Sequence, residues 1–289
     1  MNGRVHLVVA LSAEARPIIR RYRLKRRDDA RGFTVHEGPE HFLVVSGTGT
    51  LSSAAATAFL HGFAGSRTAA WINVGIAGSR NHAVGRSVLA HKIVEPQSRR
   101  AHYPALPFRP PCPSDTLWTV DRPERTFPDD GLYDMEASGF ACTATRFATR
   151  ELVHALKVAS DGPATPTTAL NERQVETLIE GSLETLEALS IAVRALLQQL
   201  ERRSADPDGL AAMTGRHRYT VSQARLLREL LSRHAAVYGP LSATMAAGLS
   251  TAPNASTVLR ALEEELRRPL GQVNDEASMN APPRPWDPP

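Results

Sequence analysis

The chain has 289 residues, enough for one large domain or two smaller ones with apolar cores of their own. Hydrophobic residues make up 42% of it, which excludes a wholly disordered or fibrous protein. No stretch approaches the roughly 18 uncharged apolar residues of a membrane span, so no membrane partner is expected. The net charge is +4, with a basic cluster at 20–27. We interpret this cluster as a solvated helix end and its loop, because no aromatic residues alternate with it as in nucleic-acid-binding segments.

The cysteine content also limits the possible functions. Cys112 and Cys142 form no CxxC pair, and a disulfide framework or zinc site cannot be built from them. No other cluster of residues has the spacing of metal ligands, so neither a metal nor another cofactor is expected. A reducing, cytoplasmic location fits this composition best.

The first half of the chain alternates apolar runs with helical segments rich in small residues. Strands are predicted at 4–11, 33–37, 41–46, 69–75, 87–94, 117–121 and 152–160, and helices at 14–22, 51–63 and 135–146. A proline-rich loop is predicted at 103–113. This alternation is typical of an α/β fold with a largely parallel sheet. In such sheets, sites form at the C-terminal ends of the strands.

The second half is predicted to be helical, with helices at 171–203, 221–238 and 258–268. Three regions are therefore expected: a catalytic domain at 1–170, a helical extension at 171–268 and a disordered proline-rich tail at 269–289. The leucine stripe of the first helix is interpreted as a core or dimer face. Met213 to His234 has some likeness to a helix-turn-helix but lacks its turn signature, so nucleic acid is not an expected partner.

Two polar features follow early strands. Glu14 comes just after the first strand, where a carboxylate is well placed for acid–base chemistry, although many such residues are solvated acids at a helix start. The turn Gly47-Thr48-Gly49 follows another strand and opens a helix. Such a turn lets a ligand approach the backbone closely, but it is equally compatible with a tight structural turn.

Three further motifs follow later elements. Asn73 to Gly78 is interpreted as a second turn of small residues, with close backbone packing as the structural alternative. Asp134 to Ser138 places a carboxylate at a helix start, where it can also act simply on the helix dipole. Ser160-Asp161 ends the last predicted strand, where an N-cap or Asx turn is the alternative.

In this order and spacing, the motifs resemble those of the nucleoside phosphorylase superfamily. Within it, the resemblance is to methylthioadenosine/S-adenosylhomocysteine nucleosidases and futalosine hydrolases, and it covers roughly residues 4 to 162. It rests on these segments: 10–14, 46–49, 73–78 with Val84-Gly85, 134–137 and 158–161. It implies a three-layer α/β fold with a mixed central sheet, to which the helical extension is added. It also implies hydrolysis of a purine nucleoside altered at its 5′ position, such as 5′-deoxyadenosine, methylthioadenosine or S-adenosylhomocysteine, and a homodimer.

The resemblance also implies roles for individual residues. Asp161 would protonate the purine, and Glu14 would activate the attacking water. Glu136 would accept hydrogen bonds from the ribose hydroxyls. The other expected substrate-binding residues are Met135, Ser160, Gly75, Ile76, Gly78 and Thr48.

Two alternatives remain open at this point. A phosphorylase would need cationic residues to hold phosphate, and Arg16, Arg20 and Arg80 are the candidates, although surface charge is the simpler interpretation. A nucleoside-binding scaffold is the second alternative, because Ile76 stands where the family often has a serine and the segment around Trp118 is hard to align. In that case the helical extension would dock a protein partner.

Overall fold

The computed structural model describes residues 3–65, 68–163, 170–204 and 206–267. The strands are β1 (Arg4–Val9), β2 (Lys25–Arg26), β3 (Thr34–Glu37), β4 (His41–Val45), β5 (Ala69–Ser79), β6 (Ser87–Glu95), β7 (Arg100–His102), β8 (Ser114–Thr119), β9 (Leu132–Asp134) and β10 (Val153–Asp161). The helices are α1 (Ser12–Tyr22), α2 (Thr50–Ala64), α3 (Ala137–Ala144), the short 3-10 helix η1 (Arg150–Leu152), α4 (Glu172–Ser204), α5 (Leu210–Arg216), α6 (Val221–Tyr238), α7 (Ala243–Thr251) and α8 (Ala255–Arg267).

The strands form one mixed sheet in the order β10-β6-β8-β9-β5-β1-β4-β3-β2, with β7 paired to β6. The strands β4, β1, β5 and β10 are parallel neighbours in turn, whereas β3, β9 and β6 pair antiparallel with β4, β5 and β10. A further pairing of β10 with β5 closes one half of the sheet on itself. The expected α/β fold with a mixed sheet is confirmed. The simpler expectation of a largely parallel sheet holds for the strands β4, β1, β5 and β10, to which antiparallel pairings are added.

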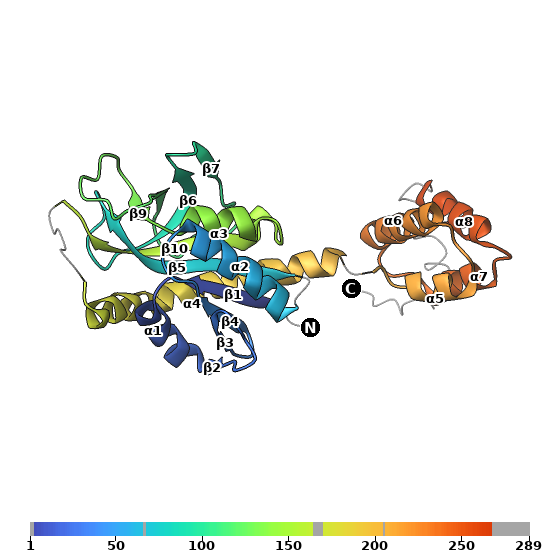
Figure 1. Cartoon of the computed structure of the whole chain (residues 1–289). Coiled ribbons are helices and arrows are strands. Elements are labelled where there is room, and N and C mark those ends of the chain that lie inside the picture. The colour runs from blue at the N-terminus through green and yellow to red at the C-terminus, as the bar shows by residue number, and fades with distance from the viewer. Residues whose placement is uncertain (1–2, 66–67, 164–169, 205, 268–289) are drawn as a thin grey trace, which may run out of the picture. The chain divides into compact units, whose positions relative to one another are not determined.

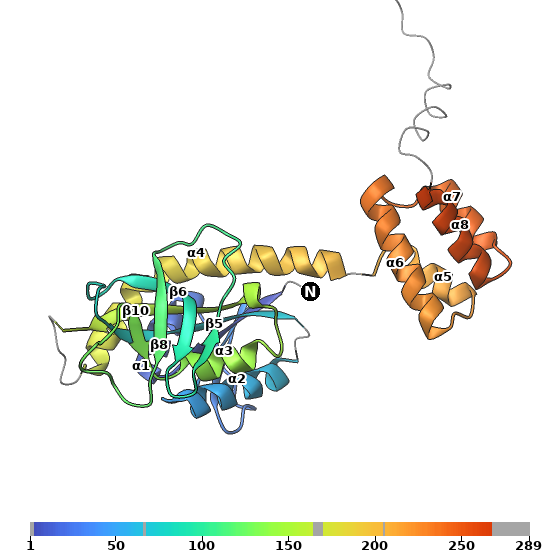
Figure 2. The same ribbon diagram turned by 90° about the horizontal axis from the view of Figure 1, so that it is seen from above.

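Helices cover the sheet on two sides and create three layers (Figures 1 and 2). Residues of α2 and α3 pack on one face around Trp71 and Phe140. On the other face, α1 and α4 enclose a second apolar core that includes Ile18, Leu43 and Ile72. Most of the stripe on α4 is buried there, at Ile179, Leu186, Val193 and Leu197, while Leu183 and Leu200 are partly buried against the same core. Of the two expected roles for this stripe, the structure therefore assigns it to the core.

The first compact unit extends through α4 and ends at Arg203, and the second begins at Ser204. The boundary expected after residue 170 lies before α4 and thus inside the first unit, because α4 shares its apolar core. Ion pairs also join α4 to α1. Arg16 and Arg20 both contact Glu176, and Arg21 contacts Glu187. Part of the basic cluster at 20–27 is therefore matched by acids of α4.

The second compact unit is a small helical bundle formed by α5 to α8. Its core contains Met213, Leu227, Leu249, Val258 and Leu262. The helix predicted at 221–238 is α6 with the same bounds, and the Thr220 side chain caps it by accepting a hydrogen bond from Gln223 N. Helices α5 and α7 were not predicted from the sequence. The tail at 269–289 lies outside the described residues. In the described part of the chain, no helix is long and apolar enough to cross a membrane.

Three buried histidines make the stability of the fold dependent on pH. Burial lowers the pKa of His6 to about 3 and those of His41 and His154 to about 4. In the unfolded chain, each imidazole takes up a proton near pH 6.5. Their contribution is therefore fully present above pH 6.5 and is lost as the pH falls towards the folded-state values.

We expect each of these histidines to cost about 2 kcal/mol of folding free energy on going from pH 7.5 to pH 5. Urea unfolding at both pH values measures this loss. His6, which is edge-on to the Trp71 ring, is the best residue to replace. The variant His6→Leu should lose less stability over the same pH interval than the parent. An identical pH dependence of the parent and the variant would show that His6 makes no such contribution.

Candidate active site

A cavity of about 270 Å³ lies where strands β1, β5, β9 and β10 end or pair. Eight of the nine residues expected from the sequence line it: Glu14, Thr48, Ile76, Gly78, Met135, Glu136, Ser160 and Asp161. The ninth, Gly75, lies directly against Glu14. Residues far apart in the chain thus meet at one place. A cavity of this kind, with several carboxylates in its wall, is the expected form of a site for acid–base chemistry.

Glu14 lies near the start of α1 and is only 2% exposed. Main-chain N–H groups of two segments hold its carboxylate. Its Oε2 accepts hydrogen bonds from Ala10 N at 3.0 Å and Leu11 N at 2.9 Å, and its Oε1 accepts one from Ile76 N at 2.9 Å. Burial raises the pKa of Glu14, and nearby Lys157 opposes the rise. The carboxylate is therefore fixed in direction and more basic than a solvated glutamate, as a general base should be.

The segment from Asn73 to Gly78 is part of strand β5 and not the turn expected from its glycines. The glycines serve close approach instead. A Cβ on Gly75 would lie 2.7 Å from Glu14 Oε1, and a Cβ on Gly78 would lie 2.6 Å from the Phe127 ring. Glycine inside a strand commonly marks such an approach by another group.

Substitution of Gly75 by alanine is expected to displace the Glu14 carboxylate. The added methyl group should destabilise the fold by about 1–3 kcal/mol and lower turnover of the substrate by tenfold or more. Gly62→Ala is the matched control, because a Cβ at this position on α2 has no neighbour within 4 Å. Thermal unfolding and kcat of both variants test the prediction, and equal behaviour of the two would contradict it.

Asp134 is the last residue of β9, Glu136 directly precedes α3, and both are buried. Glu136 Oε1 accepts a hydrogen bond from Gly49 N at 2.9 Å, which explains the position of the Gly47-Thr48-Gly49 turn. Asp134 accepts hydrogen bonds from the Thr119 hydroxyl at 2.8 Å and from Ala137 N at 2.9 Å. Burial raises the pKa of Glu136.

Lys157 supplies a buried positive charge beneath these carboxylates. Its Nζ lies 2.9 Å from Asp134 Oδ2, and its side chain is only 2% exposed. Burial alone would lower the pKa of Lys157, but Asp134, Glu136 and Glu14 raise it above its usual value. One fixed ammonium group therefore offsets the repulsion among three carboxylates in a closed space.

Ser160 and Asp161 both face the cavity because strand β10 contains a bulge. Ala159 pairs with Ala77 of β5 and Asp161 pairs with Gly78, so that Ser160 is an extra residue. In a regular strand, Ser160 and Asp161 would point to opposite faces. Instead, the Ser160 hydroxyl donates to Asp161 Oδ1 at 2.5 Å. Within the described part of the chain, Asp161 Oδ2 accepts no hydrogen bond.

An aromatic wall closes the cavity beside Asp161. Phe127 is 3% exposed and has a φ of 47°, a conformation that L-residues with bulky side chains rarely adopt. Its ring meets Tyr133 edge-on at 5.5 Å. Arg80 holds the loop in place through hydrogen bonding to Pro128 O and an ion pair with Asp130. Strained residues of this kind often occur at ligand sites, and the ring offers a surface for a planar base.

Lys157, Phe127 and Thr119 were not expected from the sequence as site residues. For Lys157 a signal was present, because a lysine in the middle of an apolar strand must have a partner. Phe127 gave no such signal, since its loop has no regular pattern.

The three arginines considered for phosphate binding have other partners. Arg16 and Arg20 pair with acids of α4, and Arg80 holds the loop at 128–130. No arginine or lysine is among the described residues that line the cavity.

Comparison with solved structures shows the same fold in nucleosidases. Residues covering 66% of this chain match 96% of the 5′-methylthioadenosine nucleosidase of Arabidopsis thaliana, with a TM-score of 0.57 and 17% identity. The methylthioadenosine/S-adenosylhomocysteine nucleosidase of Helicobacter pylori matches over 65% of this chain and 97% of its own, with a TM-score of 0.55 and 14% identity. Futalosine hydrolase of Helicobacter pylori matches over 65% of this chain and 97% of its own, with a TM-score of 0.54 and 14% identity.

These neighbours confirm the nucleoside phosphorylase-like fold expected from the sequence motifs. No family model matches the chain, and no curated protein matches its sequence. The fold is thus defined by structure, while the identity of the substrate depends on the chemistry of the cavity.

Proposed function

We propose that this chain hydrolyses the N-glycosidic bond of a 5′-modified purine nucleoside and releases the purine base. The proposal depends on one observation: Glu14, Glu136 and Asp161 line the same cavity. No lysine or arginine is among the described residues of that lining. The likeness in fold to nucleosidases supports the reaction class.

The chemistry of the reaction explains the need for two carboxyl groups, one that donates a proton and one that activates water. Cleavage leaves a ribosyl group with oxocarbenium character and a purine that requires a proton. Asp161, with Oδ2 unbonded within the described structure, would deliver this proton. Phe127, which packs on Gly78 next to Asp161, would stack on the purine and so orient it towards the acid.

Glu14 would activate the attacking water. Its Oε1 accepts a single N–H in the described structure, from Ile76, so a lone pair remains for a water molecule. Glu136 would accept hydrogen bonds from the ribose hydroxyls, with Met135 against the sugar. Thr48 and Ser160 would complete the wall. Lys157 would keep Glu14 and Glu136 ionised against their burial, as a positioning charge that does not itself contact the substrate.

Base release is the direct test. The protein is incubated with 5′-deoxyadenosine, methylthioadenosine, S-adenosylhomocysteine, inosine and futalosine, each with and without phosphate, and free base is measured by liquid chromatography. We expect release without phosphate. Release only with phosphate would make the protein a phosphorylase. Tight nucleoside binding without release would favour a scaffold, and failure to bind any nucleoside would contradict both the hydrolase and the scaffold.

A homodimer and a cytoplasmic location are further parts of this proposal. The dimer follows from the family resemblance and not from the leucine stripe of α4, which is buried in the core. Sedimentation at several concentrations tests it. The cysteines Cys112 and Cys142 are unpaired, in accord with a reducing compartment. A protein partner for the helices α5 to α8 stays a prediction, and co-purification with the full chain would identify it.

A further inference from the structure

A second cavity, of about 660 Å³, lies at the other end of strand β10. Val153, the first residue of β10, lines this cavity, whereas Asp161, the last, lines the candidate active site. At 3.3 Å per residue, the two ends of the strand are roughly 26 Å apart. The second cavity is therefore a separate feature, large enough for a small organic ligand.

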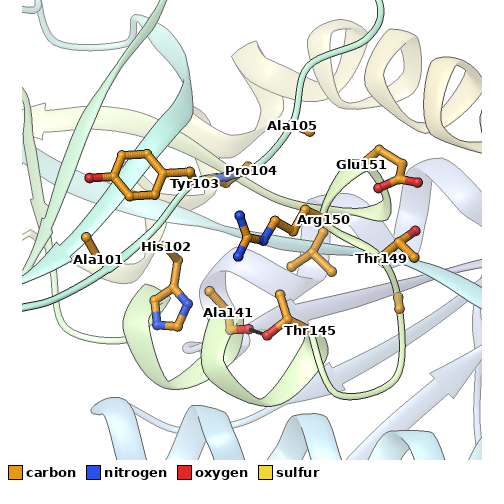
Figure 3. A pocket seen from close by; sticks show the side chains of 12 residues that line it. Ala101, His102, Tyr103, Pro104, Ala105, Ala141, Thr145, Thr149, Arg150 and Glu151 are labelled. Atoms are coloured by element: carbon orange, nitrogen blue, oxygen red, sulfur yellow. Dashed lines mark hydrogen bonds between the residues drawn. The ribbon is translucent and has the colours of Figure 1, made fainter.

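A cationic side chain without a partner reaches into this cavity. Figure 3 shows Arg150 of η1 extending towards His102 and Tyr103, with the Glu151 side chain turned to its other side. The Arg150 guanidinium makes no hydrogen bond or ion pair within the described structure. Arg16, Arg20, Arg21 and Arg27 of the same unit are paired with acids, whereas Arg99, Arg100 and Arg146 also make no side-chain hydrogen bond or ion pair within the described residues. Arg150 differs from these three because it lines the cavity.

The surroundings of Arg150 favour a negatively charged, partly flat ligand. The Tyr103 and Thr149 hydroxyls also line the cavity and have no hydrogen bond within the described residues. Tyr103 as a whole residue is 54% exposed, and Pro104 follows it in the cavity lining. Burial lowers the pKa of His102, with Glu95 opposing the shift and with smaller lowering contributions from Arg100 and Arg150. Glu151 is the only acidic residue among the described residues that line the cavity.

We propose that this cavity binds an organic anion in which a phosphate or carboxylate group adjoins a planar ring, with Arg150 holding the charged group and Tyr103 packing against the ring. Arginine presents a planar fork of donors to such oxyanions, and an aromatic ring provides apolar contact at small entropic cost. The proposal does not depend on the reaction at the other end of β10.

The test uses the full chain and probes that do not resemble nucleosides. Phenyl phosphate, benzoate, inorganic phosphate and neutral phenol are titrated by calorimetry into the parent protein. We expect one of the two ring-bearing anions to bind, more tightly than inorganic phosphate, and phenol not to bind. Whether phenyl phosphate or benzoate binds better identifies the charged group. Absence of binding by both ring-bearing anions would overturn the proposal.

Two arginine variants separate a built site from general surface charge. In Arg150→Met, binding of the preferred anion should weaken by about tenfold or more, because a charge-assisted hydrogen bond is lost. Arg146→Met, in which an exposed arginine outside the cavity lining is changed, should bind like the parent. Circular dichroism confirms that both variants fold. The proposal would be overturned if binding of the preferred anion weakened equally in both variants, or if Arg150→Met bound it as tightly as the parent. Probe binding that disappears as the chain associates, with calorimetry and sedimentation run over the same protein concentrations, would also overturn it, because a second copy would then occupy this face.

Discussion

Replacement of Asp161 by asparagine is expected to reduce kcat for base release by about 10²- to 10⁴-fold, the usual contribution of a positioned general acid. Asparagine keeps the shape of the side chain and can still accept the hydrogen bond from Ser160, so the bulge in β10 should be retained. KM should change little, because the lost interaction belongs to the transition state. Single-turnover kinetics on the best substrate of the panel measure the effect.

Two comparisons make this result specific. Asp121→Asn, at an exposed position outside the cavity lining, should keep parental turnover. A substrate whose leaving group needs no proton, such as a nitrophenyl riboside, should be cleaved almost equally by the parent and by Asp161→Asn. If Asp161→Asn lost activity on both substrates alike, Asp161 would hold the site together and would not be the general acid.

Replacement of Lys157 by methionine is expected to have the largest effect on stability. It leaves Asp134, Glu136 and Glu14 buried without their cation, and removing one member of a buried charged group costs about 3–5 kcal/mol. Without Lys157, the pKa values of Glu14 and Glu136 should rise further above their ordinary values. The acid limb of the kcat/KM profile should therefore move to higher pH.

The sign of the pH effect on stability follows from the same shifts. In the unfolded chain, the carboxyl groups lose their protons near pH 4.5. In folded Lys157→Met, the same carboxyl groups keep their protons to higher pH, because their pKa values are raised. The loss of stability relative to the parent should be small below pH 4.5 and grow as the pH rises towards neutrality. Urea unfolding at pH 4.5, 6 and 7.5 measures it. Lys25→Met, at an exposed position on β2, is the control, and a constant deficit across this pH range would contradict the electrostatic explanation.

Local patterns in the sequence predicted the elements that local interactions determine. The helix at 221–238 was predicted with its exact bounds, because Thr220 caps its start and Gly239 follows its end. The three-residue strand β9 was missed, since it is too short for a periodic pattern and exists only through pairing with β5 and β8. The strands β2, of two residues, and β7, of three residues, were missed for the same reason.

The site was predicted from the order of its motifs, while its internal geometry was not. The glycines between Asn73 and Gly78 predict a turn, because glycine usually weakens a strand, but in the structure Gly75 and Gly78 each make room for a side chain from a distant segment. The bulge at Ser160 depends on the register between β10 and β5, which is a long-range property. The ion pair between Lys157 and Asp134 joins two elements whose proximity a single sequence does not reveal.

The packing of α4 determines where the coding sequence can be truncated without loss of an apolar core. A coding sequence that stops before Glu172 would lack the helix that covers one face of the sheet, and its product would present Leu43 and Ile72 to solvent and invite aggregation. A coding sequence that stops after Arg203 would keep both apolar layers and every described wall of the two cavities. The helices α5 to α8 are thus a module that recombination could exchange without disturbing the candidate active site.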